Sequence, residues 1–199
     1  MMATIAAAGR LAAPADAADG ADAAGRAGAA DAVASADLRS VYGTLLLEAG
    51  LAAAGCGDTA GVTDLIGQAG ALAGQVGDGQ DHQQLSFGPA AVECARVTAA
   101  VELGDAADAV RRHTTIIRRG GWLRLPVEHR AAYLVDAARA YLDLGDLVAA
   151  GRWLVEAHRV APAEIRCRPA ARTVIGEVAR RGPQVAGVAR LATALGLAR

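Results

Sequence analysis

Residues 143–151 read DLGDLVAAG, and residues 102–110, ELGDAADAV, repeat the same pattern. A Gly-Asp pair stands in each stretch and occurs again at Gly57-Asp58, so the glycines recur at intervals of 47 and 41 residues. Each pair follows one segment with helical periodicity and precedes another. Gly can take the left-handed conformation that ends a helix, and Asp can accept from the free N–H groups of the next helix. The repeated pair therefore predicts a series of helix hairpins.

The helical period continues outward from these turns. Aromatic residues make up only 3% of the chain, and no alternating apolar run suggests a strand. We therefore expect an all-α domain over residues 38–199, with Asp37 capping a first helix that runs to about Ala54. Residues 1–37 are nearly all Ala, Asp and Gly, which predicts a disordered low-complexity tail. The closing stretch 188–199, VARLATALGLAR, is predicted to form an amphipathic helix that covers the last hairpin.

One of these turns also fits a sequence motif that binds dinucleotides. Residues 55–60 read GCGDTA, which fits a Gly-x-Gly-x-x-Ala phosphate-binding fingerprint. That fingerprint must follow a strand and open a helix. The preceding residues, LLLEAGLAAA, have a helical pattern instead. The sequence therefore favours a helix-hairpin turn at this position.

The third hairpin resembles a tetratricopeptide repeat, a helix pair of about 34 residues. Residues 131–164 read AAYLVDAARAYLDLGDLVAAGRWLVEAHRVAPAE. The positions in the register of that family are Leu134, Ala137, Ala138, Tyr141, Gly145, Ala150, Leu154, Ala157 and Pro162. Small Ala138 and Ala150 would let the two helices approach, while Tyr141 and Leu154 would fill the space around them. The preceding hairpin fits less well, because His113 stands where a large apolar residue is expected.

A second resemblance covers most of the predicted domain. The segments SVYGTLLLEAGLAAAGCGD, FGPAAVECARVTAAVELGDAADAV, LPVEHRAAYLVDAARAYLDLGD and EAHRVAPAEIRCRPAARTVIGEV are similar to the C-terminal domain of XRE-type helix-turn-helix transcriptional regulators from high-GC bacteria. The resemblance implies a tetratricopeptide-like α-α superhelix of antiparallel hairpins that senses a regulatory signal. Two features depart from that family: no DNA-binding domain precedes Asp37, and Ala90 and Ala91 replace the polar residues that usually follow FGP.

The implied function is binding of a peptide, protein or small-molecule effector in the groove of the superhelix. The first helix of each hairpin lines that groove, and the register places five polar residues near it: Arg96, Thr98, Glu102, Arg139 and Asp143. Asp136 and Arg139 are interpreted as an ordinary pair on one helix face. The alternatives are a stand-alone adaptor, a homodimerisation module and a non-functional remnant of a longer regulator.

The composition and the spacing of the reactive residues also indicate which functions we do not expect. The net charge is −1, all 20 basic residues are Arg, and the three cysteines lie far apart without metal-ligand spacing. No grouping of His, Cys or carboxylates suggests catalysis, so we expect no enzyme activity, no metal and no cofactor. No stretch approaches the length of a membrane span, which favours a cytoplasmic protein without membrane contact. The chain offers no recognition helix after residue 199, so no sequence-specific DNA contact is expected.

Overall fold

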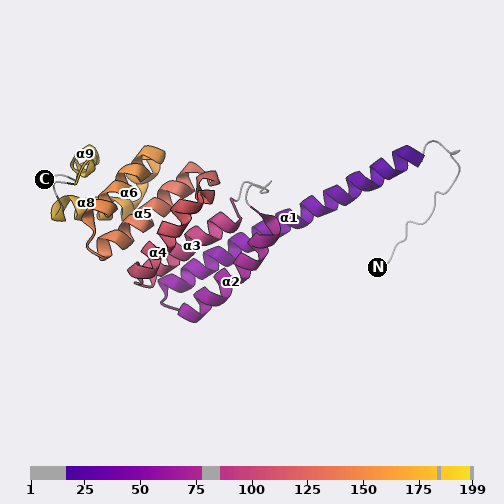
Figure 1. Ribbon diagram of the computed structural model, residues 1–199, viewed down its shortest axis with the longest axis horizontal. Coiled ribbons are helices and arrows are strands. Elements are labelled where there is room, and N and C mark those ends of the chain that lie inside the picture. Colours follow the sequence, from indigo (N-terminus) through magenta and orange to yellow (C-terminus); the bar gives the residue numbers. More distant parts are fainter. Residues whose placement is uncertain (1–16, 78–85, 183–184, 198–199) are drawn as a thin grey trace, which may run out of the picture. The chain divides into compact units, whose positions relative to one another are not determined.

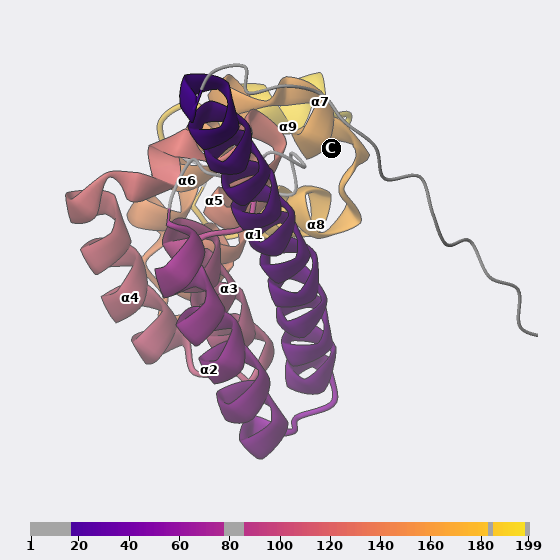
Figure 2. The same cartoon turned by 90° about the vertical axis from the view of Figure 1, so that its right-hand side faces the viewer.

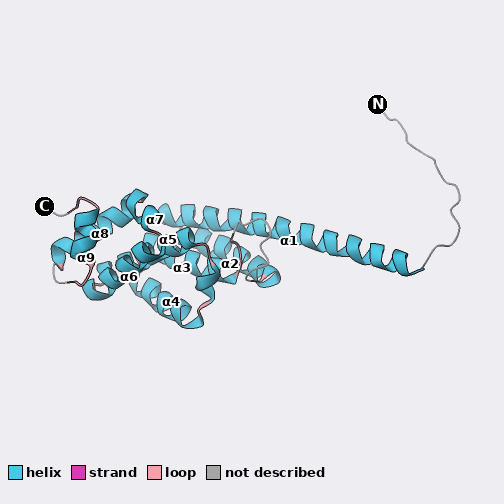
Figure 3. Cartoon of the chain, turned by 90° about the horizontal axis from the view of Figure 1, so that it is seen from above, coloured by secondary structure: helices cyan, strands magenta, loops and turns pink. Residues whose placement is uncertain are grey.

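The computed structural model describes residues 17–77, 86–182 and 185–197, with side chains from residue 35 onward. Every regular element within these ranges is a helix, and they contain no strand (Figure 3). The predicted all-α class is confirmed. The chain divides into two compact units, Met1–Ser35 and Ala36–Arg199; the first half of α1 belongs to the first unit, and the packing and hollows described below belong to the second.

The helices follow one another through short connections. In chain order they are α1 (Ala17–Gly55), α2 (Thr59–Val76), α3 (Pro89–Glu102), α4 (Ala106–Arg119), the 3₁₀ turn η1 (Gly121–Arg124), α5 (Val127–Asp143), α6 (Leu147–Val160), α7 (Pro162–Cys167), α8 (Pro169–Arg181) and α9 (Val188–Ala194).

Helix α1 begins earlier than the sequence predicts. It starts at Ala17 and passes through Asp37, which therefore does not cap it. Part of the stretch predicted to be disordered is thus helical. The many alanines carry the highest helix propensity of any residue, and this outweighs the scattered Gly and Asp. The rest of the predicted tail, residues 1–16, lies outside the described residues.

The three Gly-Asp turns have the predicted geometry. Gly57, Gly104 and Gly145 adopt φ angles of +76°, +78° and +82°, in the left-handed region. The following aspartates cap α2, α4 and α6. Each accepts a hydrogen bond at 2.9 Å from the backbone N–H group three residues further on. In Figure 2, the turn after α1 joins it to α2 at the lower end of the two helices. The GCGDTA segment therefore connects two helices and does not follow a strand.

The helices share two hydrophobic clusters that meet on α3. One is built from α2, the second half of α1 and the α3 residues Val92, Ala95 and Ala99. The other runs from the α3 residues Val97 and Val101 through α4–α9. Helix α3 thus holds the first hairpin against the rest of the unit. Figure 1 shows α3 beside α4 and α5 beside α6, the pairs that the Gly-Asp turns connect.

Six of the nine positions in the repeat register are buried, whereas Tyr141 is half-buried and Gly145 and Pro162 are exposed. Ala138, Ala150 and Leu154 have no exposed surface, and they lie where α5 and α6 meet. At the C-terminal end, α9 packs on α6 and α8, and it buries Val188 and Leu191. The prediction of a closing helix on the last hairpins is confirmed for the described part of residues 188–199.

Candidate functional site

One hollow of the unit is lined by the first helices of successive hairpins. We call it the α1–α3–α5 groove; its volume is about 430 Å³. Ligand sites commonly have volumes of roughly 300–1,000 Å³. Its lining combines apolar and polar side chains from residues Thr44, Leu47, Glu48, Leu51, Ser86, Phe87, Ala91, Cys94, Ala95, Thr98, Leu125, His129, Ala132, Tyr133, Asp136 and Arg168.

A half-buried carboxyl group lines this groove. Asp136, in the middle of α5, accepts a hydrogen bond of 2.8 Å from the Thr98 hydroxyl on α3. Burial raises the pKa of Asp136 above its usual range, and the hydrogen bond from Thr98 opposes that rise. The hydrogen bond joins residues that are 38 positions apart in the chain, so it also links two successive hairpins.

The arginines near Asp136 are engaged by other carboxylates. Arg139 on α5 pairs with Glu102 on α3, with 2.6 Å between Nη1 and Oε1. Arg168 donates from Nε to Glu164 at 2.8 Å. These guanidinium groups still attract the Asp136 charge through space, whereas Glu102 repels it. No ion pair within the described ranges includes Asp136.

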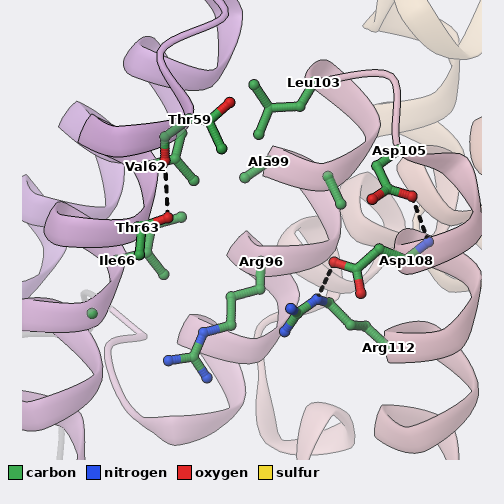
Figure 4. A pocket seen from close by; sticks show the side chains of 12 residues that line it. Thr59, Val62, Thr63, Ile66, Arg96, Ala99, Leu103, Asp105, Asp108 and Arg112 are labelled. Carbon is green, nitrogen blue, oxygen red and sulfur yellow. Dashed lines mark hydrogen bonds and ion pairs between the residues drawn. The ribbon is translucent and has the colours of Figure 1, made fainter.

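A second hollow lies on another face of α3. This α2–α3–α4 cleft has a volume of about 450 Å³ and contains the Arg96 side chain (Figure 4). Arg96 also pairs with Glu93 on its own helix. On the other wall, Arg112 pairs with Asp108 at 2.6 Å. Both arginines in this cleft thus pair with a carboxylate of their own helix, and Asp108 also pairs with Arg111.

The five predicted site residues do not share one site. Thr98 lines the α1–α3–α5 groove, whereas Arg96 lies in the α2–α3–α4 cleft. Residues two apart on a helix face different directions, which explains the separation. Glu102 and Arg139 pair with each other and line neither hollow, and Asp143 is exposed at the end of α5.

The interpretation of Asp136 changes with the structure. Arg139 pairs across helices with Glu102 rather than with Asp136 on its own helix face. Asp136 is instead the most deeply placed carboxyl of the groove. Its position in the apolar stretch AYLVDAARAYL was a signal for this, because a lone acid among core residues of a helix faces the interior or a site. Glu48 and Arg168 join it only through the fold.

A buried histidine packs behind the groove and lines neither hollow. His113 on α4 is 1% exposed, and its Nδ1 shares a hydrogen bond of 2.6 Å with the Tyr133 hydroxyl. The rings of Tyr141 and Trp153 lie edge-on to it. Burial, together with the charge of Arg152, lowers the pKa of His113 to about 4. His113 thus serves as a neutral core residue at a position where the repeat pattern expects a large apolar one.

Metal-binding clusters and membrane-spanning helices are both absent from the described residues. Within residues 17–77, 86–182 and 185–197, no three His, Cys, Asp or Glu side chains gather closely enough to hold a metal ion. None of the helices in those same ranges has both the length and the apolar character required to cross a bilayer.

Comparisons of the whole chain with protein-family models, with curated proteins and with solved structures find no match.

Proposed function

We propose that this chain is a regulatory binding module, with a tetratricopeptide-like array of helix hairpins that takes an effector in the α1–α3–α5 groove. The observation that carries the proposal is the groove itself, which is lined by the first helix of three successive hairpins and contains a half-buried carboxyl. The repeated Gly-Asp turns support the array, because the turn glycines of the three hairpins have nearly the same φ angle. By its sequence resemblance, the module is related to the sensing domain of a cytoplasmic helix-turn-helix regulator.

Binding is favoured over catalysis by the chemistry of the groove. Asp136 is bonded to Thr98, and the adjoining Tyr133 hydroxyl is bonded to His113. Burial raises the pKa of Tyr133, so the phenol stays neutral. A general acid-base pair would need titratable groups converging on one reacting atom. These two groups on α5 instead bond that helix to Thr98 on α3 and to His113 on α4, which holds the walls of the groove in place.

The test is to fill the groove and measure whether an effector is lost. Ala132 lines the groove on α5, and Ala132→Trp would occupy it. Ala107 on α4 is exposed and lines neither hollow, so Ala107→Trp is the matched control. Native mass spectrometry of each chain after incubation with an extract of its own cells should show a bound mass on the wild type and on the control. The bound mass should be absent from Ala132→Trp.

Either of two results would refute the proposed groove. One is the same bound mass on Ala132→Trp as on the wild type. The other is no bound mass on any of the three chains while circular dichroism shows all of them folded.

A second candidate function is self-association. Leu38, Val41, Tyr42 and Leu45 are exposed on one face of α1, and Leu38 and Leu45 keep 70% and 61% of their surface accessible. Their spacing of three and four residues forms a continuous stripe along the helix. Large exposed apolar patches often mark protein contacts. The stripe favours a homodimer.

A further inference from the structure

The groove carries an excess of negative charge. Its lining includes two carboxylates, Asp136 and Glu48, one arginine, Arg168, and one histidine, His129. Arg168 donates to Glu164 from both Nε and Nη2, so its charge is largely neutralised. Neither carboxylate of the lining belongs to an ion pair within the described residues. A cationic ligand that enters the groove therefore meets carboxylates that form no ion pair with a described side chain.

Asp136 is placed to receive a hydrogen-bond donor. It already accepts one hydrogen bond, from Thr98, and a carboxylate has further acceptor sites. A bond between a carboxylate and a cationic donor is roughly twice as strong as one between neutral groups. Burial disfavours the charged form of Asp136, and a nearby cation favours it.

The other lining residues indicate that the rest of the ligand is apolar. Leu47 and Leu51 come from α1, Phe87 precedes α3, and Leu125 precedes α5. These side chains would cover an apolar group, while Asp136 and Glu48 would hold a positive head. A volume of about 430 Å³ accommodates a small molecule.

We infer that the α1–α3–α5 groove binds a small organic cation, with a primary ammonium or guanidinium head on Asp136 and an apolar body against Leu47, Leu51 and Phe87. The inference rests on the proposed function of the groove and narrows it to one class of ligand. An anion would have to compete with Glu164 for Arg168 and would approach two carboxylates, so it fits the lining less well.

Three probes of equal chain length test the charge preference directly. Hexylammonium, hexan-1-ol and hexanoate would be titrated into ¹⁵N-labelled protein at pH 7.5, and affinity would be read from amide chemical shifts. Hexylammonium should bind best, with shifts around Thr98 and Asp136. Asp136→Asn should weaken its binding by about tenfold or more, because a charge-assisted hydrogen bond is lost. Asp143→Asn is the control, since it removes the same charge from the exposed end of the same helix.

Three results of these titrations would contradict the proposed binding of a cation. Equal binding of hexylammonium and hexan-1-ol, tighter binding of hexanoate, or insensitivity to Asp136→Asn would each overturn the cation assignment. A further probe is the blocked tripeptide acetyl-Leu-Lys-Leu-amide. If it binds more tightly than hexylammonium, the cation belongs to a peptide side chain and the small-molecule assignment is wrong. Filling the groove with Ala132→Trp tests the groove whatever the charge of the ligand, so failure of the proposed function is recognised independently.

Discussion

The Thr98 hydroxyl on α3 donates a hydrogen bond of 2.8 Å to the carboxylate of Asp136 on α5, at the wall of the α1–α3–α5 groove. This contact stabilises the charged form of a carboxyl group that burial disfavours. It also joins the first helices of two successive hairpins. The chemistry of the groove and the packing of the hairpins therefore depend on the same pair of residues.

Removing this hydroxyl should change the titration of Asp136. In Thr98→Val, the pKa of Asp136 should rise above its already raised wild-type position, because the charged form loses its hydrogen bond. Stability at neutral pH should fall by about 1 kcal/mol. Carboxyl ¹³C shifts followed as a function of pH measure the first effect. An Asp136 titration identical to that of the wild type would show that the hydrogen bond does not form in solution.

His113 should make the fold less stable as the pH falls. Its pKa is lowered from 6.5 to about 4 in the folded chain, so below pH 6.5 the unfolded chain binds a proton that the folded chain excludes. Its contribution is complete above pH 6.5 and is lost as the pH falls towards 4, a change on the order of 3 kcal/mol. Urea unfolding between pH 7.5 and 4.5 measures the slope.

His113→Phe is the comparison that isolates this effect. The raised pKa of Asp136 acts in the opposite direction, because the folded chain then holds the extra proton, but it is common to both chains. The difference in stability between wild type and His113→Phe should therefore shift with pH by the contribution of His113 alone. Parallel curves for the two chains would mean that His113 titrates normally in the fold.

Gly145 should tolerate only residues that accept a left-handed backbone. Its φ of +82° ends α5 and positions Asp146 to cap α6. Gly145→Val should destabilise the chain by roughly 1–2 kcal/mol, whereas Gly145→Asn should cost less, because Asn visits this region more readily. Thermal melting of the two variants provides the test. Equal melting temperatures for both variants and the wild type would contradict the turn geometry.

Gly43 on α1 should not tolerate even a methyl group. A Cβ at this position would overlap the Phe87 ring, which is buried beside it. Gly43→Ala should cost about 1–3 kcal/mol through overpacking. Gly74→Ala on α2 is the control: a Cβ there meets no atom within 4 Å, so helix propensity alone should stabilise the chain by about 0.5–1 kcal/mol. Opposite signs in chemical unfolding would support the contact between α1 and Phe87.

The apolar stripe on α1 should govern self-association. The double change Leu38→Glu with Leu45→Glu should shift a dimer to monomer in analytical ultracentrifugation, because like charges would face each other across the contact. Val148→Glu changes an apolar residue on α6 that is 72% exposed and should leave the dimer intact. A wild-type chain that stays monomeric at high concentration would exclude the homodimer as its function.

The turns could be predicted from the sequence because their cause is local. A left-handed Gly followed by a capping Asp needs no information beyond a few residues, and Gly57, Gly104 and Gly145 all behave as expected. The start of α1 could not be placed, because the preference of Ala for helix competes with Gly and Asp over many residues and the balance is set by their sum.

The site was predictable only in part. The register placed Thr98 and Arg96 in one groove, whereas Thr98 lines the α1–α3–α5 groove and Arg96 lines the α2–α3–α4 cleft. The pairing of Arg139 with Glu102 rather than with Asp136 depends on how α3 and α5 pack. Contacts between helices that are far apart in the chain are not encoded in local periodicity, so Asp136 became recognisable as a groove residue only in three dimensions.

The most direct test of the groove is to locate a bound effector on the chain itself. The small-molecule fraction of an extract from its own cells would be added to the ¹⁵N-labelled protein, and amide shifts would be compared before and after. The proposed function predicts that the shifted amides cluster around Thr98 and Asp136 and that Ala132→Trp abolishes the shifts. Shifts clustered around Thr63 and Arg112 in the α2–α3–α4 cleft, or no shifts at all, would contradict it.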